Sequence, residues 1–228
     1  MTKIKVCCIS DTHGYLPQEL PEADMLLHAG DLTHHNDMQD QAAFMNTKFY
    51  PWWKEQKARL KYFIAGNHDF VFEEFPALLN KDVFEDYLQD DYASALVDMR
   101  LPRVDFDAPT VWGTPRTPTY GRWAFMGSEM FLEHKFSVIP SCTDIIISHG
   151  PPHGILDKNL AGEHCGSKAL LKRVNEIKPK LVVFGHIHEG RDGASVFVNE
   201  HGTKFVNASI MNGQFRPNNE PVIVEIEL

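Results

Sequence analysis

Residues 181–190 read LVVFGHIHEG, a short apolar run that ends on two histidines. Continuous runs of Leu, Val and Phe are typical of strands buried on both faces, and in α/β proteins ligands bind at the carboxyl ends of such strands. In extended backbone, His186 and His188 point to the same side and Ile187 to the other. This stretch therefore predicts a buried strand that leads into a pair of metal-binding imidazoles.

Four more apolar runs end on residues that bind metals. The runs are VCCI at 6–9, MLL at 25–27, YFIA at 62–65 and III at 145–147. The first run leads into Asp11 and His13, and the second into Asp31. The third leads into Asn67 and His68, and the fourth into His149. If all five runs lie in one sheet, their C-terminal loops can converge on one place that holds two carboxylates, an amide and five imidazoles. We know of no purely structural use for such a cluster, so we expect a metal centre.

The residue types in these loops suit a pair of ions. Asp11 and His13 stand two residues apart beyond a strand, so a carboxylate oxygen and an imidazole nitrogen can approach one ion. A glycine precedes Asp31 and another precedes Asn67, and glycine permits tight turns close to an ion. Asp31 is the candidate bridge between two cations, because both of its oxygens have spare lone pairs. Asn67 offers a neutral oxygen, which keeps the ions electrophilic.

Composition limits the class of protein. A chain of 228 residues, 43% of them hydrophobic, suits one large domain or at most two small ones. The 22 basic and 31 acidic residues give a net charge of −9, which argues against binding to duplex nucleic acid but allows a small phosphorylated substrate. No apolar stretch approaches the ~18 residues that a membrane helix needs, so we expect no membrane partner.

The start of the chain and its cysteines indicate an intracellular protein. The first residues, MTKIKVCCISD, contain one strand-like run and no small-residue cleavage site, so no signal peptide is expected. Cys7, Cys8, Cys142 and Cys165 show neither a disulfide framework nor a CxxC spacing for zinc. Cys7 and Cys8 are neighbours in a strand-like run and should point to opposite faces. We therefore predict a reduced protein in the cytoplasm.

The first half of the chain predicts helices between its strands. Residues 37–60 suit a helix that Pro51 breaks or kinks. The acidic stretch 71–108 has apolar residues at roughly helical spacing, which predicts one or two short surface helices. The acidic run 73–91 within it is interpreted as a solvated face, because nothing in the sequence indicates a partner there.

The second half predicts strands and one clear helix. Residues 110–113 suit a strand that precedes a Pro-rich surface loop, TPRTPTYGRW. Ser167–Lys178 has one apolar face and suits an amphipathic helix that ends before Pro179. Three more strands are expected at 195–198, 204–207 and 222–226. These elements fit a three-layer or four-layer α/β sandwich with a mixed sheet.

The motifs D-x-H, G-D, G-N-H-D, S-H-G and G-H-I-H occur in this order between residues 11 and 188, and together they resemble the calcineurin-like metallophosphoesterase superfamily. The resemblance implies a single domain over residues 1–228 with a four-layer αββα sandwich and mixed sheets. It implies that one metal is held by Asp11, His13, Asp31 and His188. It implies that the second is held by Asp31, Asn67, His149 and His186. His68 would bind no metal and would face the substrate.

A narrower resemblance is to the metallophosphoesterase-domain-containing (MPPED, 239-like) subgroup of class III phosphodiesterases. The motifs are W-G-T-P-R-T-P (112–118), W-A-F (123–125), S-H-G-P-P (148–152), H-C-G-S (164–167), G-H-I-H-E-G (185–190) and N-A-S-I (207–210). The subgroup is associated with hydrolysis of phosphodiesters, including cyclic nucleotides. Some animal members have glycine at the position that matches His188 and are poorly active, so the histidine here implies a competent enzyme.

The resemblance implies a reaction driven by two divalent ions. A hydroxide that bridges the ions would attack phosphorus directly, and Asp31, as the shared ligand, is part of this catalytic centre. His68 would stabilise charge on the phosphoryl oxygens or protonate the leaving group as a general acid. Asp69 could orient the His68 ring or simply hold the turn. Oxygen ligands without thiolates favour Mn²⁺ in assays, while Fe, Zn, Ni or Co also suit such a site.

Several residues have two interpretations at this point. His164, in the loop G-E-H-C-G-S, could face the substrate or could lead into a helix capped by Ser167. Arg116 and Trp112 could bind phosphate or stack a base, or could be a solvated Arg and a packed Trp. Asn207 could line the pocket, and His153 could support His149. The other histidines, His28, His34, His35, His134 and His201, are expected to have ordinary surface or core roles.

The expected function is a two-metal phosphodiesterase that acts on a small, cyclic or linear, nucleotide. The first alternative is a phosphomonoesterase or phosphoprotein phosphatase on the same scaffold. A metal-free adaptor that binds proteins is disfavoured, because such adaptors lose metal ligands that this chain retains. A DNA nuclease is disfavoured by the net charge of −9. Protein partners cannot be inferred from the sequence.

Overall fold

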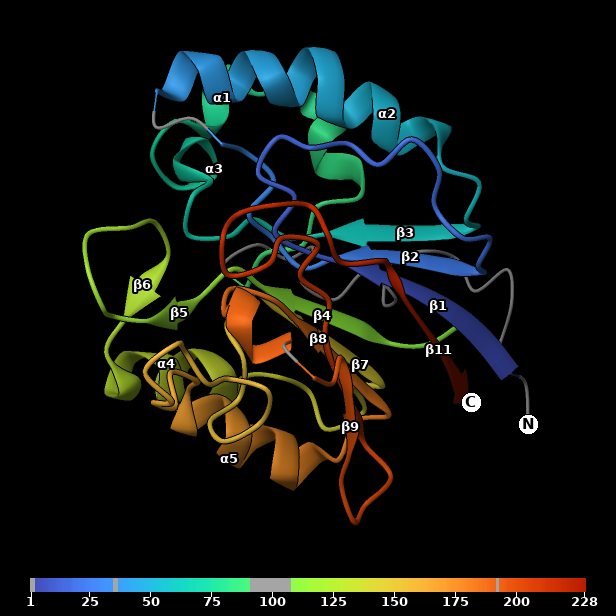
Figure 1. Cartoon of the computed structure of the whole chain (residues 1–228), viewed down its shortest axis with the longest axis vertical. Helices are drawn as coiled ribbons and strands as arrows, with labels where there is room; N and C mark the ends of the chain where they lie inside the picture. Colours follow the sequence, from blue (N-terminus) through green and yellow to red (C-terminus); the bar gives the residue numbers. More distant parts are fainter. Residues whose placement is uncertain (1–2, 35–36, 91–107, 192) are drawn as a thin grey trace.

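The computed structural model describes residues 3–34, 37–90, 108–191 and 193–228, which form two sheets packed face to face with helices on both outer faces (Figure 1). The first sheet has the strand order β11-β1-β2-β3, with β1 parallel to β2, β2 parallel to β3 and β11 antiparallel to β1. Its strands are β1 (Lys3–Ile9), β2 (Met25–His28), β3 (Leu60–Phe63) and β11 (Val222–Glu227). The predicted four-layer αββα sandwich with mixed sheets is confirmed.

The second sheet has the order β4-β7-β8-β10-β9, parallel except for β9 at the edge. Its strands are β4 (Val111–Thr114), β7 (Ile145–Ser148), β8 (Leu181–Phe184), β10 (Lys204–Asn207) and β9 (Val196–Val198). The five apolar runs are therefore divided, three in the first sheet and two in the second, and the expectation of one sheet is wrong. In both sheets, a strand is covered by helices on one face and by the other sheet on the opposite face. It is therefore buried on both faces, and its apolar sequence does not indicate which sheet it joins.

The core between the sheets is built from alternate residues of both. Val6, Met25, Ile147 and Val183 belong to this one buried cluster. Cys8 belongs to it as well, whereas Cys7 packs in the cluster on the outer face of the first sheet. The two cysteines thus point to opposite faces, as the period of a strand requires.

A long helical segment covers the first sheet. It consists of α1 (Met38–Phe44), a π-helical turn η1 (Met45–Phe49) and α2 (Tyr50–Glu55), and it ends before Leu60, which begins β3. Pro51 does not break it. Proline has no N–H and clashes with the carbonyl four residues earlier. Here the π turn directly before Pro51, with the Tyr50 N–H bonded to the Met45 carbonyl, adjusts the backbone without ending the helix.

The acidic stretch forms three short helices, where one or two were predicted: α3 (Phe70–Glu74), η2 (Pro76–Leu78) and η3 (Lys81–Glu85). Residues 91–107 lie outside the described residues. The interpretation as a solvated face holds only in part. Glu85 accepts a hydrogen bond from Tyr50, and Asp86 accepts one from the buried Trp53 indole at 3.0 Å. These carboxylates fasten the stretch to the long helical segment.

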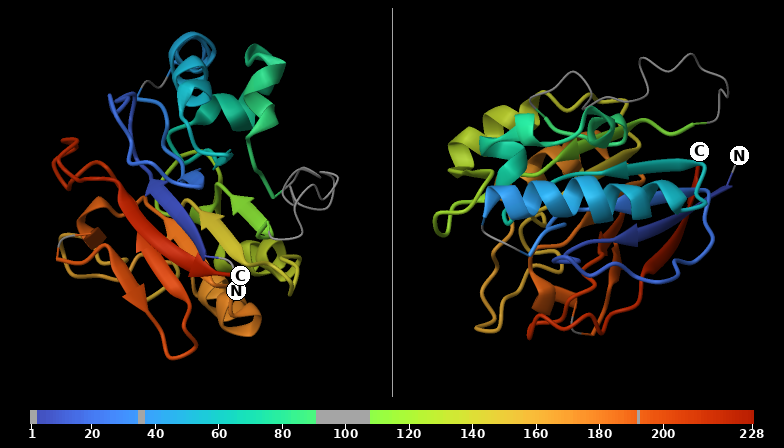
Figure 2. Two further views of the ribbon diagram at one scale, coloured as in Figure 1. Left: turned by 90° about the vertical axis from the view of Figure 1, so that its right-hand side faces the viewer. Right: turned by 90° about the horizontal axis from the view of Figure 1, so that it is seen from above.

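The second sheet is covered by α4 (Glu129–Ser137) and α5 (Lys168–Ile177), on the side opposite α1 and α2 (Figure 2). The Ser167 hydroxyl caps α5 by accepting from the Leu170 N–H, as expected. The helix α4 was not predicted from the sequence. Its Glu129 carboxylate accepts from the N–H groups of Lys168 and Ala169, so α4 supplies a second cap for α5.

The Pro-rich segment after β4 is only partly a surface loop. It contains β5 (Thr117–Pro118), which pairs with β6 (Met126–Gly127), and Thr117 is fully buried. Farther along, Tyr120 is exposed, so the turn between β5 and β6 lies at the surface. Within the described parts of the chain, no helix combines the length and the apolar character needed to cross a membrane.

The inter-sheet core is expected to dominate stability. Ile147→Ala removes a fully buried side chain from this core and should lower the free energy of unfolding by about 2–5 kcal/mol. Urea denaturation monitored by circular dichroism measures this. Val198→Ala, on the exposed edge strand β9, is the matched control and should change stability by less than about 0.5 kcal/mol. Equal effects of the two substitutions would contradict the proposed location of the core.

Candidate metal centre

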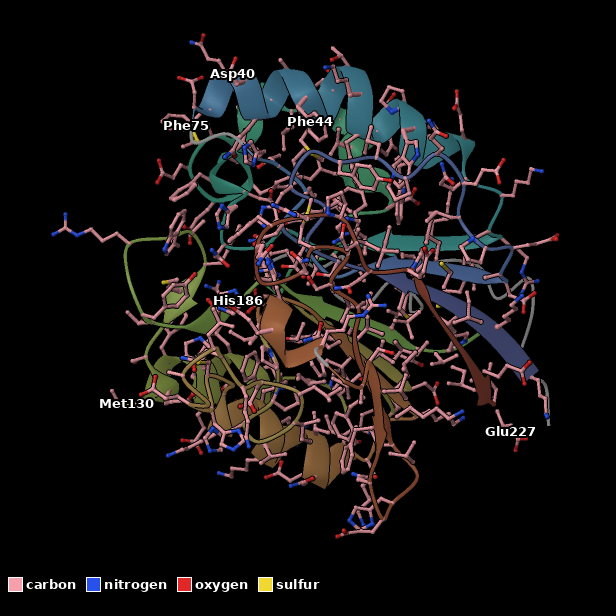
Figure 3. All side chains as sticks on the ribbon, in the orientation of Figure 1. Asp40, Phe44, Phe75, Met130, His186 and Glu227 are labelled. Atoms are coloured by element: carbon pink, nitrogen blue, oxygen red, sulfur yellow. The ribbon has the colours of Figure 1, made fainter. Side chains whose placement is uncertain are left out.

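The loops that follow β1, β2, β3, β7 and β8 meet where the carboxyl ends of the two sheets come together. The sheets are joined there by a parallel bridge between Ser10 and Ser209. The His149 Nδ1 atom bonds to the Ala29 carbonyl at 2.9 Å, which ties the second sheet to the loop after β2. In Figure 3 the labelled His186 lies in the middle of the molecule, between the upper and lower helical layers. Convergence of the predicted residues therefore arises from two sheets instead of one.

Asp11, His13 and His188 form one group of ligand atoms, all within 4.8 Å of one another. The His188 Nε2 atom lies 3.3 Å from Asp11 Oδ1, and the Nε2 atoms of His13 and His188 are 3.4 Å apart. All three side chains are buried. A carboxylate and two imidazoles that face one another in this way match the ligands predicted for one metal.

Asp31, His149 and His186 form a second group with the same spacing. The His149 Nε2 atom lies 3.4 Å from Asp31 Oδ1 and 2.9 Å from Asn67 Oδ1, so the amide oxygen also points into the group. Asn67 is fully buried. The structure therefore brings together the residues predicted for the second metal.

Asp31 connects the two groups. Its Oδ2 atom lies 3.6 Å from His13 Nε2 in the first group, whereas its Oδ1 atom faces His149 in the second. The His68 N–H donates to the same Oδ1 atom at 2.8 Å. Each oxygen thus faces a different set of imidazoles, which is the arrangement that a bridging carboxylate requires.

The chemistry of the second group fits a cation. The His149 Nδ1 atom bonds to a carbonyl, so in the neutral ring, which is the form that binds a metal, Nδ1 carries the proton and Nε2 is an acceptor. That acceptor faces two more acceptors, the oxygens of Asn67 and Asp31. The Asn67 Nδ2 atom is buried and has no hydrogen-bond partner among the described residues. A divalent ion satisfies three converging acceptors, and nitrogen and oxygen ligands without thiolate suit Mn, Fe, Zn, Ni or Co.

The ligand loops hold an unusual backbone conformation. Asp11, His13, Asp31 and His186 all have left-handed φ angles, of 51°, 43°, 53° and 67°. Such angles cost of order 1–3 kcal/mol for a residue other than glycine and persist where the surroundings enforce them. Four strained residues within one ligand set indicate that the fold is organised to aim these side chains.

Glycines next to the ligands allow the loops to approach closely. A Cβ atom on Gly185 would lie 2.0 Å from Asp11 Oδ2, and one on Gly66 would lie 2.3 Å from Asp31 Oδ1. Any side chain at either position would displace a carboxylate. The glycine before Asn67 therefore allows its loop to approach the Asp31 carboxylate, and the glycine before His186 allows its loop to approach the Asp11 carboxylate.

Charge within the centre is balanced by protonated imidazoles. Burial raises the pKa of the Asp11 carboxyl, but the adjacent His188 lowers it further, and the net pKa is well below the usual range. Burial lowers the pKa of His149, but the Asp31 charge raises it to about 9. The centre thus attracts positive charge, which a divalent ion would supply in place of these protons.

Asp69 holds the ligand loops. Its carboxylate accepts from the N–H groups of Leu32, Thr33 and Gly66, at 3.0, 2.8 and 2.8 Å. Burial raises its pKa, and so does the Asp31 charge, to about 6. Of the two interpretations of Asp69, the one as a residue that holds the turn is confirmed, since these bonds connect the Asp31 loop to the Asn67 loop.

His68 and Asn207 differ in their exposure to the centre. The half-buried His68 ring lies edge-on to His13, with centroids 4.7 Å apart, at the side of the first group. Asn207 is fully buried, and its Nδ2 atom donates to the Ile187 carbonyl at 2.9 Å. It therefore supports the loop that carries His186 and His188, which is a different role from lining the pocket.

Arg116 and Trp112 are structural. The Arg116 Nε atom donates to Asp90 at 2.7 Å, and the guanidinium lies over the Phe131 ring with only 7% of the residue exposed. Trp112 packs in the core beside Phe136. The prediction of Arg116 as a phosphate ligand fails, because its charge is neutralised by a buried ion pair.

His164 forms a separate group with Asp157. Its Nδ1 atom lies 2.6 Å from the buried Asp157 carboxylate, and His153 lies 4.0 Å from the same carboxylate. His153 therefore associates with Asp157, not with His149. Of the smaller predictions, His34 is exposed as expected, His35 lies outside the described residues, and His28 is a buried core residue bonded to Thr12.

Sequence reasoning missed three aromatic residues beside the centre, namely Tyr120, Trp123 and Phe215. The centroid of each ring lies within 5.3 Å of the ring centroid of His68, His186 or His188. Tyr120 and Phe215 follow turns rich in Gly, Pro and Asn, where an exposed aromatic residue is a usable signal. Aromatic side chains of this kind belong to no metal-binding motif, so the motifs that predict the ligands do not indicate these three residues.

Comparisons with known proteins agree with this geometry. The family model described as calcineurin-like phosphoesterase matches residues 4–190. Human metallophosphoesterase domain-containing protein 1 is 32% identical over 96% of this chain and 70% of its own. The UPF0046 protein K07C11.7 of Caenorhabditis elegans is 29% identical over 98% of this chain and 75% of its own. The solved structure of TT1561 from Thermus thermophilus shares the fold, with a TM-score of 0.59, 14% identity and coverage of 90% and 89% of the two chains.

Asp31→Asn tests the shared carboxylate. The substitution removes a charge and turns one oxygen that faces the imidazoles into an NH₂ group, so affinity for both ions should fall by more than about 100-fold. Equilibrium dialysis with Mn²⁺ measures this, with about two ions expected for the wild type. Asp40→Asn on the exposed face of α1 is the control. If the Asp31 variant still binds two ions with unchanged affinity, Asp31 is not a shared ligand.

Proposed function

The chain belongs to the calcineurin-like phosphoesterase family, and from this premise we propose that it is a phosphodiesterase that uses two divalent ions. Family membership identifies a metal-dependent hydrolase of phosphoester bonds. The finer proposal is that the substrate is a small nucleotide, including cyclic nucleotides. The observation that carries the proposed two-ion centre is Asp31, whose two oxygens face two separate groups of imidazoles.

The proposed ligand set follows the geometry of the two groups. One ion would be held by Asp11, His13, Asp31 and His188, and the other by Asp31, Asn67, His149 and His186. Bound there, the two ions would supply a hydroxide nucleophile and stabilise the attacking and leaving oxygens of an in-line displacement. We propose Mn²⁺ as the metal for assays, since no thiolate lies among the ligands.

His68 is the proposed general acid. Its backbone N–H is fixed on Asp31, and its ring lies between the Trp123 ring, stacked at 4.4 Å, and the nearly perpendicular His13 ring, at 4.7 Å. The ring is half-buried, so it can reach a substrate that enters the centre. From this position it would donate a proton to the leaving alkoxide or a hydrogen bond to a phosphoryl oxygen.

A cytoplasmic location remains a prediction. The four cysteines are all free, and Cys7 and Cys8 are buried, which agrees with a reducing compartment.

A phosphomonoesterase on the same scaffold is the competing function. Rates of the Mn²⁺-loaded protein on bis(p-nitrophenyl) phosphate and p-nitrophenyl phosphate separate the two, because only the first is a diester. The proposed phosphodiesterase should have the higher kcat/KM on the diester. A higher kcat/KM for the monoester would overturn the proposal.

His68→Ala is expected to retain both metal ions and to lose turnover. No ligand is removed, whereas loss of general acid catalysis should lower kcat on a 2′,3′-cyclic nucleotide, whose alkoxide leaving group needs a proton, by about 10²–10⁴-fold. Metal content and steady-state rates are measured on the same preparation. His134→Ala, on the exposed face of α4, serves as the control and should keep the wild-type rate. A His68 variant with wild-type turnover would refute the role assigned to this ring.

A further inference from the structure

Three aromatic side chains surround the metal centre without belonging to its ligand set. The Phe215 ring lies 4.8 Å from the His188 ring, on the side of the first group. The Tyr120 ring lies 5.3 Å from the His186 ring, on the side of the second group. The Trp123 ring is stacked on His68 at 4.4 Å and an interplanar angle of 30°. The rings therefore border both groups and the proposed general acid.

Two of these rings are open to solvent. Tyr120 is 58% exposed and Phe215 is 57% exposed, although the histidines that they contact are largely shielded. Phe215 also has a left-handed φ angle of 55°, which is a strained conformation for an aromatic residue. An exposed phenyl ring that is held in a strained backbone beside a polar centre gains little from packing. Its position is more readily explained by a ligand that covers it.

The backbone beside Trp123 and the segment that leads to Phe215 are bonded to the ligand loops. The Ala124 N–H, next to Trp123, donates to the Asn67 carbonyl at 3.1 Å. On the other side, the Ile210 N–H donates to the Ser10 carbonyl at 2.8 Å, directly before Asp11. The segments that carry these two rings are therefore tied to the segments that carry the ligands.

The Phe215 turn is closed by local bonds. The Phe215 N–H donates to the Asn212 carbonyl at 2.9 Å, and the Asn212 side chain accepts from the N–H groups of Gln214 and Arg216. Trp123 and Phe215 are thus held in place relative to the metal ligands, and a ligand that stacks on them loses little free energy to ordering of the protein.

We propose that Tyr120, Trp123 and Phe215 form an aromatic subsite that stacks the base of a nucleotide substrate. This inference rests on the proposed phosphodiesterase function. A phosphoryl group bound at the two ligand groups has its ester substituents within reach of rings that contact the same histidines. Stacking of a base on aromatic side chains is worth about 1–3 kcal/mol per base, and it tolerates any base. The subsite therefore selects nucleoside esters over alkyl esters without selecting a particular base.

The test compares two diesters that release the same leaving group. Thymidine 5′-(p-nitrophenyl phosphate) carries a base, and methyl p-nitrophenyl phosphate does not. The Mn²⁺-loaded wild type should prefer the nucleoside diester. Phe215→Leu combined with Tyr120→Leu should reduce that preference in kcat/KM by about tenfold, mainly through KM. Both residues are exposed, so the variant is expected to fold, and circular dichroism checks this. Phe197→Leu on the edge strand β9, at 45% exposure, is the matched control.

A binding measurement separates this inference from the proposed function. Calorimetry on the Mn²⁺-loaded protein compares AMP with ribose 5-phosphate, which has the same phosphate and sugar but no base. Tighter binding of AMP that is lost in the double variant supports the subsite, even if neither diester is hydrolysed and the proposed function fails. Equal binding of both ligands to the wild type, or equal losses on both diesters in the variant, would overturn the subsite.

Discussion

Two buried carboxylates, Asp11 and Asp31, impose the constraint that the rest of the structure satisfies. Burial of negative charge is unfavourable unless positive charge lies nearby. Here each carboxylate is surrounded by imidazoles, and although burial lowers the pKa values of His149 and His188, the carboxylate charges raise both above the ordinary value. The requirement also explains why the fold tolerates strained backbone at several ligands. The geometry that neutralises the carboxylates is the geometry that would bind two cations.

The sandwich architecture provides this geometry because two sheets end at the same place. Three loops come from the first sheet and two from the second, and each group of ligand atoms draws residues from both. Asp69 fastens two loops of the first sheet to each other, and Asn207 fastens the His186 loop within the second. The connection between sheets then depends on direct contacts, such as the two hydrogen bonds from the His186 N–H to the Asp11 carboxylate.

The residues that gather at the centre and most elements could be predicted from the sequence, because each is encoded locally. An apolar run followed by Asp or His describes a strand and its loop, and Ser167 marks the start of α5 without reference to the rest of the fold. Features that depend on distant partners could not be predicted. Arg116 looks available for phosphate until Asp90, 26 residues away, is seen beside it. The helix α4 was missed because Met130 and Phe131 are exposed, which removes the one-sided pattern of an amphipathic helix.

The contact between Asp11 and His186 joins residues 175 positions apart in the chain. During synthesis, the nascent chain would expose Asp11, His13 and Asp31 long before the ribosome has added the last imidazoles. A partial chain can therefore present isolated residues of the two groups but neither group complete. If the groups bind metal as proposed, tight binding would have to wait until β8 has joined its sheet, and metal loading would be a late event that reports completion of the fold.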